Sequence, residues 1–275
     1  MSSSVERAVW PSTVALFKAA HFGPTLAVTV LVALLTTSFE LTFATAFLVT
    51  AAVFTGQLTI GWANDLLDRD RDRQSGRTDK PLASGEIPVR LVQASLCVAA
   101  GACVLLSFSV GWRSAVVHLF LGLASGHAYN LGLKSTAVSW LPYAIAFGTL
   151  PAVVSLAGSS PELPPWWMVT ASAALGVAAH FLNTLPDFED DAATGVRGLP
   201  HRLGQNTSRL LATTLLLSAS GIAAFGPGSP PPWSWVVLAA TVALAAVALL
   251  GRGRRPFYAA IAIAVLDVGL LTGRA

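Results

Sequence analysis

The sequence predicts an all-α membrane protein: nine transmembrane helices in a bundle that encloses a central cavity, with the N-terminus in the cytoplasm. Hydrophobic residues make up 54% of the 275 residues and charged residues only 11%. Soluble proteins are about 45–50% apolar and about 25% charged. Apolar runs long enough to cross a bilayer recur along the whole chain, and the basic residues gather on one side of the resulting bundle. Together these observations indicate a polytopic membrane protein.

The predicted spans follow one another through mostly short connections that are rich in glycine and proline. A bilayer core requires roughly 20 mainly apolar residues per helix. Runs near that length lie at about 13–37, 41–63, 89–111, 114–131, 137–158, 166–186, 207–225, 233–250 and 256–272. Two longer connections, 64–88 and 187–206, are polar. We expect one membrane-embedded domain over residues 1–275.

The basic residues predict the orientation. A cytoplasmic N-terminus places 15 of the 17 Lys and Arg on the inner side and leaves only Arg113 and Arg274 outside, as the positive-inside rule requires. We expect an integral protein of the plasma membrane whose polar connections face the cytoplasm. The N-terminal stretch lacks the features of a cleaved signal peptide, so the first span should remain. A net charge of +3 without an aromatic-interleaved basic patch argues against nucleic-acid binding.

The same motif, N-x3-D-x3-D-x3-G, occurs twice, 119 residues apart, at the start of each polar connection, with Asn183 of the second copy at the end of the preceding span. The first copy is Asn64, Asp68, Asp72 and Gly76, and the second is Asn183, Asp187, Asp191 and Gly195. One copy follows the second predicted span and the other follows the sixth. This offset predicts two four-helix pseudo-repeats, about 13–131 and 137–250, with a ninth helix added, and repeats in membrane proteins often place a site at their interface.

Spacing by four residues places successive side chains on one face of a helix. Asn64, Asp68 and Asp72 should therefore form a stripe that continues from the second span. Pro186 should end or kink the sixth helix, and the two aspartates of the second copy share a face if the helix resumes.

These acids admit three interpretations. A solvated helix end explains one acidic cluster but not its recurrence. A calcium loop at Asp68, Asp70 and Asp72 is rejected, because Arg73 stands where that loop needs glycine and the terminal Glu is absent. Magnesium is usually bound by one or two carboxylates together with substrate phosphates, which suits a substrate with a diphosphate head and an apolar tail. Candidates to meet the remaining diphosphate charge are Arg77, Lys80, Lys134, Arg197 and Arg202.

Several segments resemble the UbiA superfamily of intramembrane prenyltransferases. NDLLDRDRD at 64–72 resembles the first aspartate-rich motif of that family, and DFEDD at 187–191 resembles the second. RTDKPLASGEI at 77–87 is similar to a basic segment of the family, with Lys80 in place of the usual arginine, and AYNLGLKS at 128–135 is similar to its Tyr-to-Lys element. The resemblance covers essentially the whole chain, since the family also has nine helices.

The resemblance implies a cytoplasm-facing enzyme that uses Mg²⁺. The implied catalytic and metal-binding residues are Asp65, Asp68, Asp72, Asp187 and Asp191. The substrate-binding candidates, taken from the resemblance and from the doubled motif, are Asn64, Arg77, Lys80, Tyr129, Lys134, Asn183, Arg197 and Arg202. The expected reaction ionises the allylic C–O bond of an isoprenyl diphosphate and passes the isoprenyl group to an aromatic or other electron-rich acceptor.

Two other functions remain open. The same metal chemistry supports a terpene cyclase of the same superfamily, in which the substrate's own double bonds capture the cation. A transporter or assembly protein is suggested only by the many spans and the apparent repeat, and its site would lie near the bilayer midplane rather than at the edge.

Other polar residues carry weaker signals. Gly198 stands where relatives often have Thr or Ser, and Thr184 where some have Asn. Lys18 is a candidate for binding an acceptor carboxylate. The interleaved arginines at 69, 71 and 73 have no counterparts in the second copy, so we expect them to serve topology and local charge balance rather than chemistry. Asp267 lies inside the ninth span, where ionisable residues are functional by default, and we expect a structural hydrogen bond there.

Overall fold

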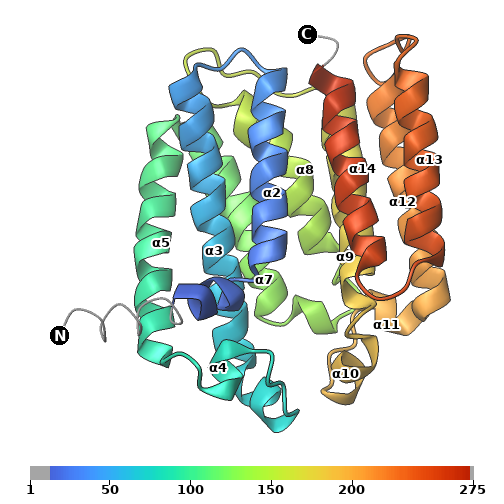
Figure 1. Ribbon diagram of the computed structural model, residues 1–275. Coiled ribbons are helices and arrows are strands. Elements are labelled where there is room, and N and C mark those ends of the chain that lie inside the picture. Colours follow the sequence, from blue (N-terminus) through green and yellow to red (C-terminus); the bar gives the residue numbers. More distant parts are fainter. Residues whose placement is uncertain (1–12, 273–275) are drawn as a thin grey trace, which may run out of the picture.

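The structure is a computed structural model that describes residues 13–272. Every regular element in this range is a helix (Figure 1), which confirms the predicted all-α fold. Arg7 and Arg274, which enter the charge count above, lie outside the described residues. The long helices are α2 (Phe22–Leu35), α3 (Phe43–Gln74), α5 (Val89–Ser109), α8 (Leu141–Ser155), α9 (Trp166–Thr184), α12 (Gln205–Phe225), α13 (Ser234–Leu250) and α14 (Arg255–Thr272).

Shorter elements connect the long helices or interrupt them. They are the 3-10 helices η1 (Thr36–Ser38) and η3 (Leu133–Ser135), the π-helix η2 (Val117–Leu123), and the short α-helices α4 (Pro81–Ser84), α6 (Trp112–Val116), α7 (Ala124–Asn130), α10 (Phe188–Ala193) and α11 (Leu199–Leu203). Elements α6, η2 and α7 together occupy the predicted fourth span. The long helices run side by side, and α4 and α10 project from the same end of the bundle (Figure 1).

The predicted spans coincide with helices, with two differences. The first span is broken, since helices Thr13–Ala19 and Phe22–Ser38 meet at an angle of 74°. His21 at this break has φ 51°, a left-handed conformation that non-glycine residues seldom adopt. The second difference is that α3 runs past the predicted end at 63 and continues to Gln74. The first acidic motif therefore lies on the same continuous helix as the second predicted span.

Tertiary packing explains the break in the first helix. A Cβ atom on Gly61 of α3 would overlap the backbone carbonyl of Ala20, so only glycine lets the two backbones approach this closely. The indole nitrogen of Trp62 donates a hydrogen bond of 2.9 Å to the carbonyl oxygen of Leu16. The short helix Thr13–Ala19 is thus held against α3.

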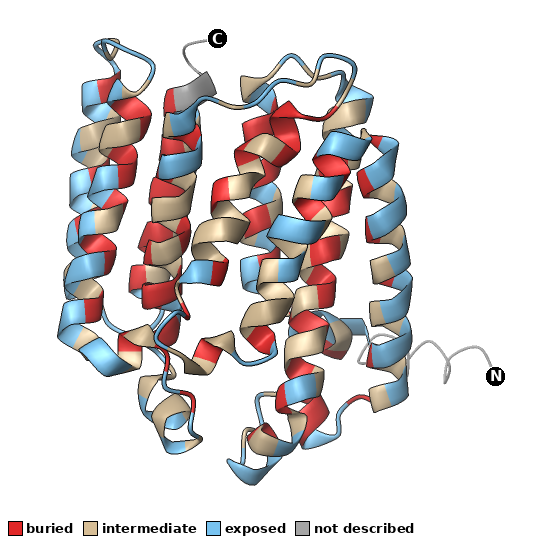
Figure 2. Ribbon diagram, turned by 180° about the vertical axis from the view of Figure 1, so that it is seen from behind, coloured by how far each residue is buried: buried red, intermediate tan, exposed pale blue. Residues whose placement is uncertain are grey.

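The outer surface of the bundle is apolar. Phe43, Val98 and Leu105 are 87%, 73% and 74% exposed, and Figure 2 shows buried residues concentrated on the inward faces of the helices. Such extensive apolar exposure marks a membrane-facing surface. By length and hydropathy α3, α5 and α12 can cross a bilayer, and the bent first pair is a fourth candidate within the described range. The chain is an integral membrane protein, and the count of nine crossings stays a prediction.

Candidate active site

The first acidic stripe lies on the last turns of α3. This helix begins at Thr42, whose hydroxyl accepts a hydrogen bond from the backbone N–H of Thr45. Part of its apolar segment is exposed on the membrane-facing surface, for example at Phe43, and its polar segment forms the C-terminal end of the helix. Asp65, Asp68 and Asp72 are 2%, 8% and 7% exposed. Buried carboxylates need partners, and the structure supplies them from other elements.

Asp68 is the most heavily paired of these carboxylates. Lys134, which is only 9% exposed, donates from Nζ to both carboxylate oxygens at 2.6 Å. The Arg71 guanidinium lies 2.8 Å from Oδ2, and Asn64 donates to the same oxygen at 3.1 Å. Lys134 reaches this place from η3, just after Gly132 turns the chain with φ 148°. The predicted first motif and the predicted Tyr-to-Lys element therefore meet at one carboxylate.

Asp65 has a different environment from the other acids of α3. Its Oδ1 accepts hydrogen bonds from Lys80 Nζ at 2.7 Å and lies 3.1 Å from His21 Nε2. Lys80 and His21 also contact each other at 2.9 Å. Both of these basic residues line the central cavity, whereas Asp65 does not. Asp65 thus lies outside the cavity lining and fixes the positions of Lys80 and His21, which form part of that lining.

The second acidic stripe lies on α10. Helix α9 ends at Thr184, before Pro186, and the chain resumes as α10 with Asp187 at its N-cap. The backbone N–H of Asp191 donates to the carbonyl oxygen of Asp187 at 2.8 Å, so the two aspartates are one helical turn apart. Burial and the neighbouring Asp187 carboxylate raise the pKa of Asp191 from 3.8 to about 6.

The two polar segments meet through Arg77. Its Nη1 lies 3.6 Å from Asp187 Oδ1, and its Nε and Nη2 donate to the two oxygens of Asp79 at 2.9 Å each. This bidentate pair lowers the pKa of Asp79 to about 2. Arg77 therefore lies at the boundary between the first and second motifs.

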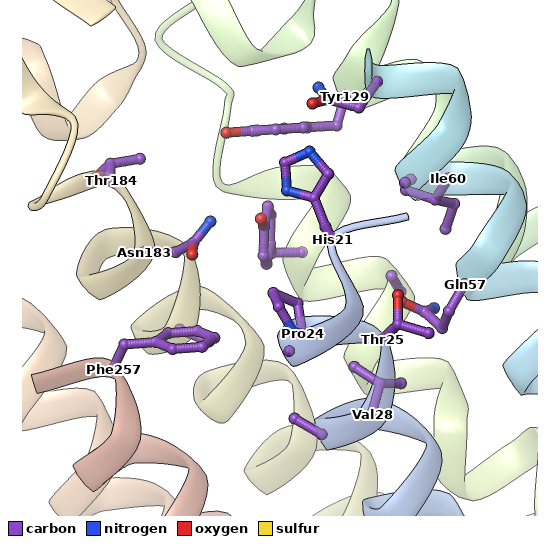
Figure 3. Close-up of a pocket in the computed structure, with 18 of the residues that line it drawn as sticks. His21, Pro24, Thr25, Val28, Gln57, Ile60, Tyr129, Asn183, Thr184 and Phe257 are labelled. Carbon is purple, nitrogen blue, oxygen red and sulfur yellow. The ribbon is translucent and has the colours of Figure 1, made fainter. Parts of the chain in front are cut away.

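These residues surround the mouth of one cavity of about 720 Å³. Its wall includes Tyr129 and Asn183, and Figure 3 shows them converging with His21 on the same space. The Tyr129 ring packs edge-on against Tyr143 at 5.2 Å. Further inside, the lining is mainly apolar and comes from α2, α8, α9 and α14: Val28, Leu31, Val32, Leu35, Ala146, Phe147, Leu150, Met168, Leu175, Ile261 and Ala264. The cavity is charged at its mouth and apolar within.

Most, but not all, of the predicted site residues line this cavity. Those that do are Asn64, Asp68, Asp72, Arg77, Lys80, Tyr129, Lys134, Asn183, Asp187 and Asp191. Arg197 and Arg202 do not; both are exposed, and Arg202 Nε donates to the carbonyl oxygen of Arg197 at 3.2 Å. Thr194 and Val196, which follow α10, still line the cavity, but these two exposed arginines do not.

Sequence reasoning missed three residues at the mouth. Arg71 pairs with Asp68, as expected for local charge balance, but it also lines the cavity, which was not expected; its position three residues after Asp68 was the available signal. Asp190 also lines the cavity. Asn130 accepts a hydrogen bond from Asn64 at 3.2 Å and donates one to Ile60 O at 2.9 Å, and no spacing in the sequence pointed to it.

Close packing explains why position 198 is glycine, where relatives often have Thr or Ser. A Cβ at this position would lie 2.6 Å from the Lys134 carbonyl oxygen and 2.8 Å from Ser139 Oγ. The same Ser139 hydroxyl accepts a hydrogen bond from Leu199 N at 2.8 Å and contacts His180 Nε2 at 3.0 Å. The segment after α10 is therefore packed directly on the loop that presents Lys134.

We expect Gly198→Ser to destabilise the protein by about 1–3 kcal/mol, because the added side chain must displace a backbone carbonyl. Loss of folded protein on heating in detergent would measure this change. Gly221→Ser is the matched control, since nothing lies within 4 Å of a Cβ at Gly221. Equal stability of the two variants would contradict the close packing at Gly198.

Residues 12–265 match the model of the UbiA prenyltransferase family. The chain belongs to this family. Its structure is similar to that of a UbiA homologue from Archaeoglobus fulgidus bound to GPP and Mg²⁺, with a TM-score of 0.69 and 16% identity over 94% of this chain and 99% of that one. At this identity the likeness shows a shared fold.

Two curated relatives are also similar to this UbiA family chain. It is 33% identical over 184 residues to the bacteriochlorophyll synthase 33 kDa chain of Cereibacter sphaeroides, a match that covers 61% of this chain and 58% of the relative. It is 28% identical over 138 residues to a 4-hydroxybenzoate octaprenyltransferase of Neisseria meningitidis serogroup C, covering 49% of this chain and 46% of the relative. The matches thus span about half the length of these relatives.

Proposed function

We propose that this protein is a Mg²⁺-dependent intramembrane prenyltransferase, which moves an isoprenyl group from an isoprenyl diphosphate to an aromatic or other electron-rich acceptor. The observation that carries the proposal is the polarity of the cavity, whose mouth is lined by two acidic stripes and several cations and whose interior is apolar. A diphosphate head and a hydrocarbon tail have the same division of polarity. Family membership and the names of both curated relatives, a synthase and a prenyltransferase, support the same activity.

The carboxylates at the mouth suit Mg²⁺. No group of three or more His, Cys, Asp or Glu that could hold a metal ion by itself was found among residues 13–272. Magnesium does not need such a cage, because it is usually bound by one or two carboxylates together with substrate phosphates. The raised pKa of Asp191 reflects burial and repulsion from Asp187, and a bound cation would relieve that repulsion. We assign the metal to Asp68, Asp72, Asp187 and Asp191.

Asp65 receives a different role from the one implied by the resemblance. It does not line the cavity, and its Oδ1 is engaged by Lys80 and His21. We therefore assign Asp65 to positioning Lys80, whose ammonium group faces the cavity. This assignment keeps Asp65 essential without requiring it to touch the metal.

The remaining side chains fit the chemistry of the leaving group. Bound Mg²⁺ would supply a Lewis acid that stabilises negative charge on the departing diphosphate. Arg77, Lys80 and Lys134 present three further cations to the same oxygens, and fixed charges in a water-poor site stabilise developing charge strongly. Tyr129 and Tyr143 also line the cavity, and we place the allylic cation beside their rings. The apolar wall excludes water, which would otherwise quench that cation.

We place the mouth of the cavity at the cytoplasmic face of the plasma membrane. This placement is supported by the charge distribution, in which 15 of 17 basic residues fall on the inner side of the nine predicted spans. Isoprenyl diphosphates would then enter from the cytoplasm or the inner leaflet, with the tail passing into the bundle.

The decisive experiment uses purified protein in lipid vesicles with labelled geranyl, farnesyl or geranylgeranyl diphosphate. We expect release of diphosphate that depends on Mg²⁺ and stops with EDTA, together with prenylation of an electron-rich acceptor such as 4-hydroxybenzoate. Cyclic hydrocarbon formed without an acceptor would favour the terpene cyclase instead. If the protein binds and consumes none of these isoprenyl diphosphates in the presence of Mg²⁺, the proposal is wrong.

A further inference from the structure

Asn130 joins helix α7 to the first acidic stripe, and the proposed reaction gives it no role. It is the last residue of α7 and is 6% exposed. Its Nδ2 donates to the carbonyl oxygen of Ile60 at 2.9 Å, and its Oδ1 accepts from Asn64 Nδ2 at 3.2 Å. Both ends of this buried amide are therefore hydrogen-bonded to α3.

Helix α7 is packed closely on α3 at this point. A Cβ at Gly126, one turn before Asn130, would overlap the side chain of Ile60, so glycine permits the close approach of the two helices. His127 Nε2 lies 3.2 Å from Thr59 Oγ1. These contacts hold the end of α7, and with it the Asn130 backbone, against α3.

The Ile60 carbonyl determines the orientation of the Asn130 amide. A carbonyl oxygen only accepts hydrogen bonds, so the nitrogen of Asn130 must face it. The Asn130 oxygen then faces Asn64, and because it also only accepts, the nitrogen of Asn64 must lie there. Asp68 Oδ2 accepts from the same Asn64 nitrogen at 3.1 Å. Two acceptors thus set the orientation of the Asn64 amide.

This orientation leaves Asn64 with one free polar atom. An amide nitrogen carries two hydrogens, and here one is donated to Asp68 and the other to Asn130. Asn64 Oδ1 has no hydrogen-bond partner among residues 13–272, and Asn64 lines the cavity. An amide oxygen cannot donate to a diphosphate oxygen. It suits a hard cation such as Mg²⁺, or a water molecule held by that ion.

We propose that Asn130 is a positioning residue, which orients the Asn64 amide so that its oxygen is presented to the metal at the cavity mouth. The inference rests on the proposed function, since it takes the acidic stripes to bind Mg²⁺. Without Asn130, one hydrogen of Asn64 loses its acceptor, and the amide is free to rotate and present its nitrogen to the cation. Hydrogen bonds that orient a metal ligand strengthen metal binding for this reason.

The test follows Mg²⁺ binding through heat stability, so it does not depend on turnover. Wild-type and Asn130→Leu protein are heated in detergent with farnesyl thiodiphosphate, a non-hydrolysable analogue, at increasing Mg²⁺. We expect the Mg²⁺ concentration for half of the stabilisation to rise about tenfold in Asn130→Leu. Saturating Mg²⁺ should restore most of the wild-type kcat with farnesyl diphosphate. Asn206→Leu is the matched control, because Asn206 is exposed on α12 and does not line the cavity; it should leave the Mg²⁺ requirement unchanged.

A second substitution separates positioning from support of the fold. Asn130→Asp keeps an oxygen that accepts from Asn64 but loses the donor to Ile60. It should lower heat stability in EDTA without raising the Mg²⁺ requirement. A residue that only joins α7 to α3 would show a loss of stability in both variants and an unchanged Mg²⁺ requirement in Asn130→Leu.

A double-variant cycle tests whether Asn130 acts through Asn64. In an Asn64→Ala background no amide remains to be oriented, so Asn130→Leu should cause no further rise in the Mg²⁺ requirement. An equal rise in both backgrounds, or no rise in Asn130→Leu alone, overturns the positioning role and leaves the proposed function intact. A wild type that neither Mg²⁺ nor the thiodiphosphate stabilises, and that consumes no isoprenyl diphosphate, refutes the proposed function as well.

Discussion

Asp68→Asn is expected to lower kcat/KM by about 10³-fold, through loss of a metal ligand and of the charge that orients Lys134. Asp68 is 8% exposed and is contacted by Lys134 at 2.6 Å and Arg71 at 2.8 Å. Asp68 thus joins two predicted site residues, Asn64 and Lys134, to Arg71. The measurement is initial rate of diphosphate release at saturating Mg²⁺, in vesicles that contain equal amounts of folded protein.

A structural explanation for that loss must be separated from a catalytic one. Asp68→Asn leaves the buried Lys134 ammonium without its main counter-charge, which costs about 3–5 kcal/mol when one partner of a buried pair is removed. Adding Lys134→Met removes the unpaired charge, so the double variant should regain thermal stability while staying inactive. Asp70→Asn is the control, because Asp70 lies off the stripe and its side chain is 74% exposed. Activity restored in the stable double variant would show that Asp68 acts only through the fold.

The sequence predicted the first motif well because α3 is one continuous helix. Residues spaced by four lie on the same face of a helix as long as the helix is not interrupted. Asp68 and Asp72 consequently share the cavity wall. The second copy was also predictable, since Pro186 marks where a regular helix must end.

Other parts of the site depend on tertiary contacts that local pattern does not encode. The break at His21 follows from the close approach of Ala20 to Gly61, and an apolar run gives no sign of it. The four-residue spacing also gives no sign that Arg197 is exposed and lies outside the cavity wall, directly after the cavity-lining Val196. Asp267 could be identified as unusual from its place in an apolar span, but only the packed structure shows that it is 3% exposed.

Asp191→Asn is the second variant with a large expected effect, a fall in kcat/KM of about 10²–10³-fold. The pKa of Asp191 is raised to about 6, so in the wild type the carboxylate becomes protonated below that pH and loses its affinity for a cation. The Mg²⁺ concentration needed for half-maximal activity should therefore rise about tenfold for each pH unit below 6. Asp191→Asn should lose this pH dependence, and the residual rate measured from pH 5 to 8 checks it.

Protonation of Asp191 cannot raise the required Mg²⁺ concentration at low pH by unfolding the protein. The pKa of Asp191 is higher in the folded chain, about 6 against 3.8, so its protonation stabilises the fold below pH 3.8, and this contribution is lost as the pH rises through 6. Acid thus favours the folded state at Asp191 while opposing metal binding. In Asp187→Asn the repulsion is removed, so the pKa of Asp191 should fall, and Mg²⁺-induced thermal stabilisation should persist to lower pH. Glu189→Gln, an exposed change on the same helix, should leave the profile unchanged. A wild-type Mg²⁺ demand that is constant from pH 5 to 7 would exclude Asp191 as a ligand.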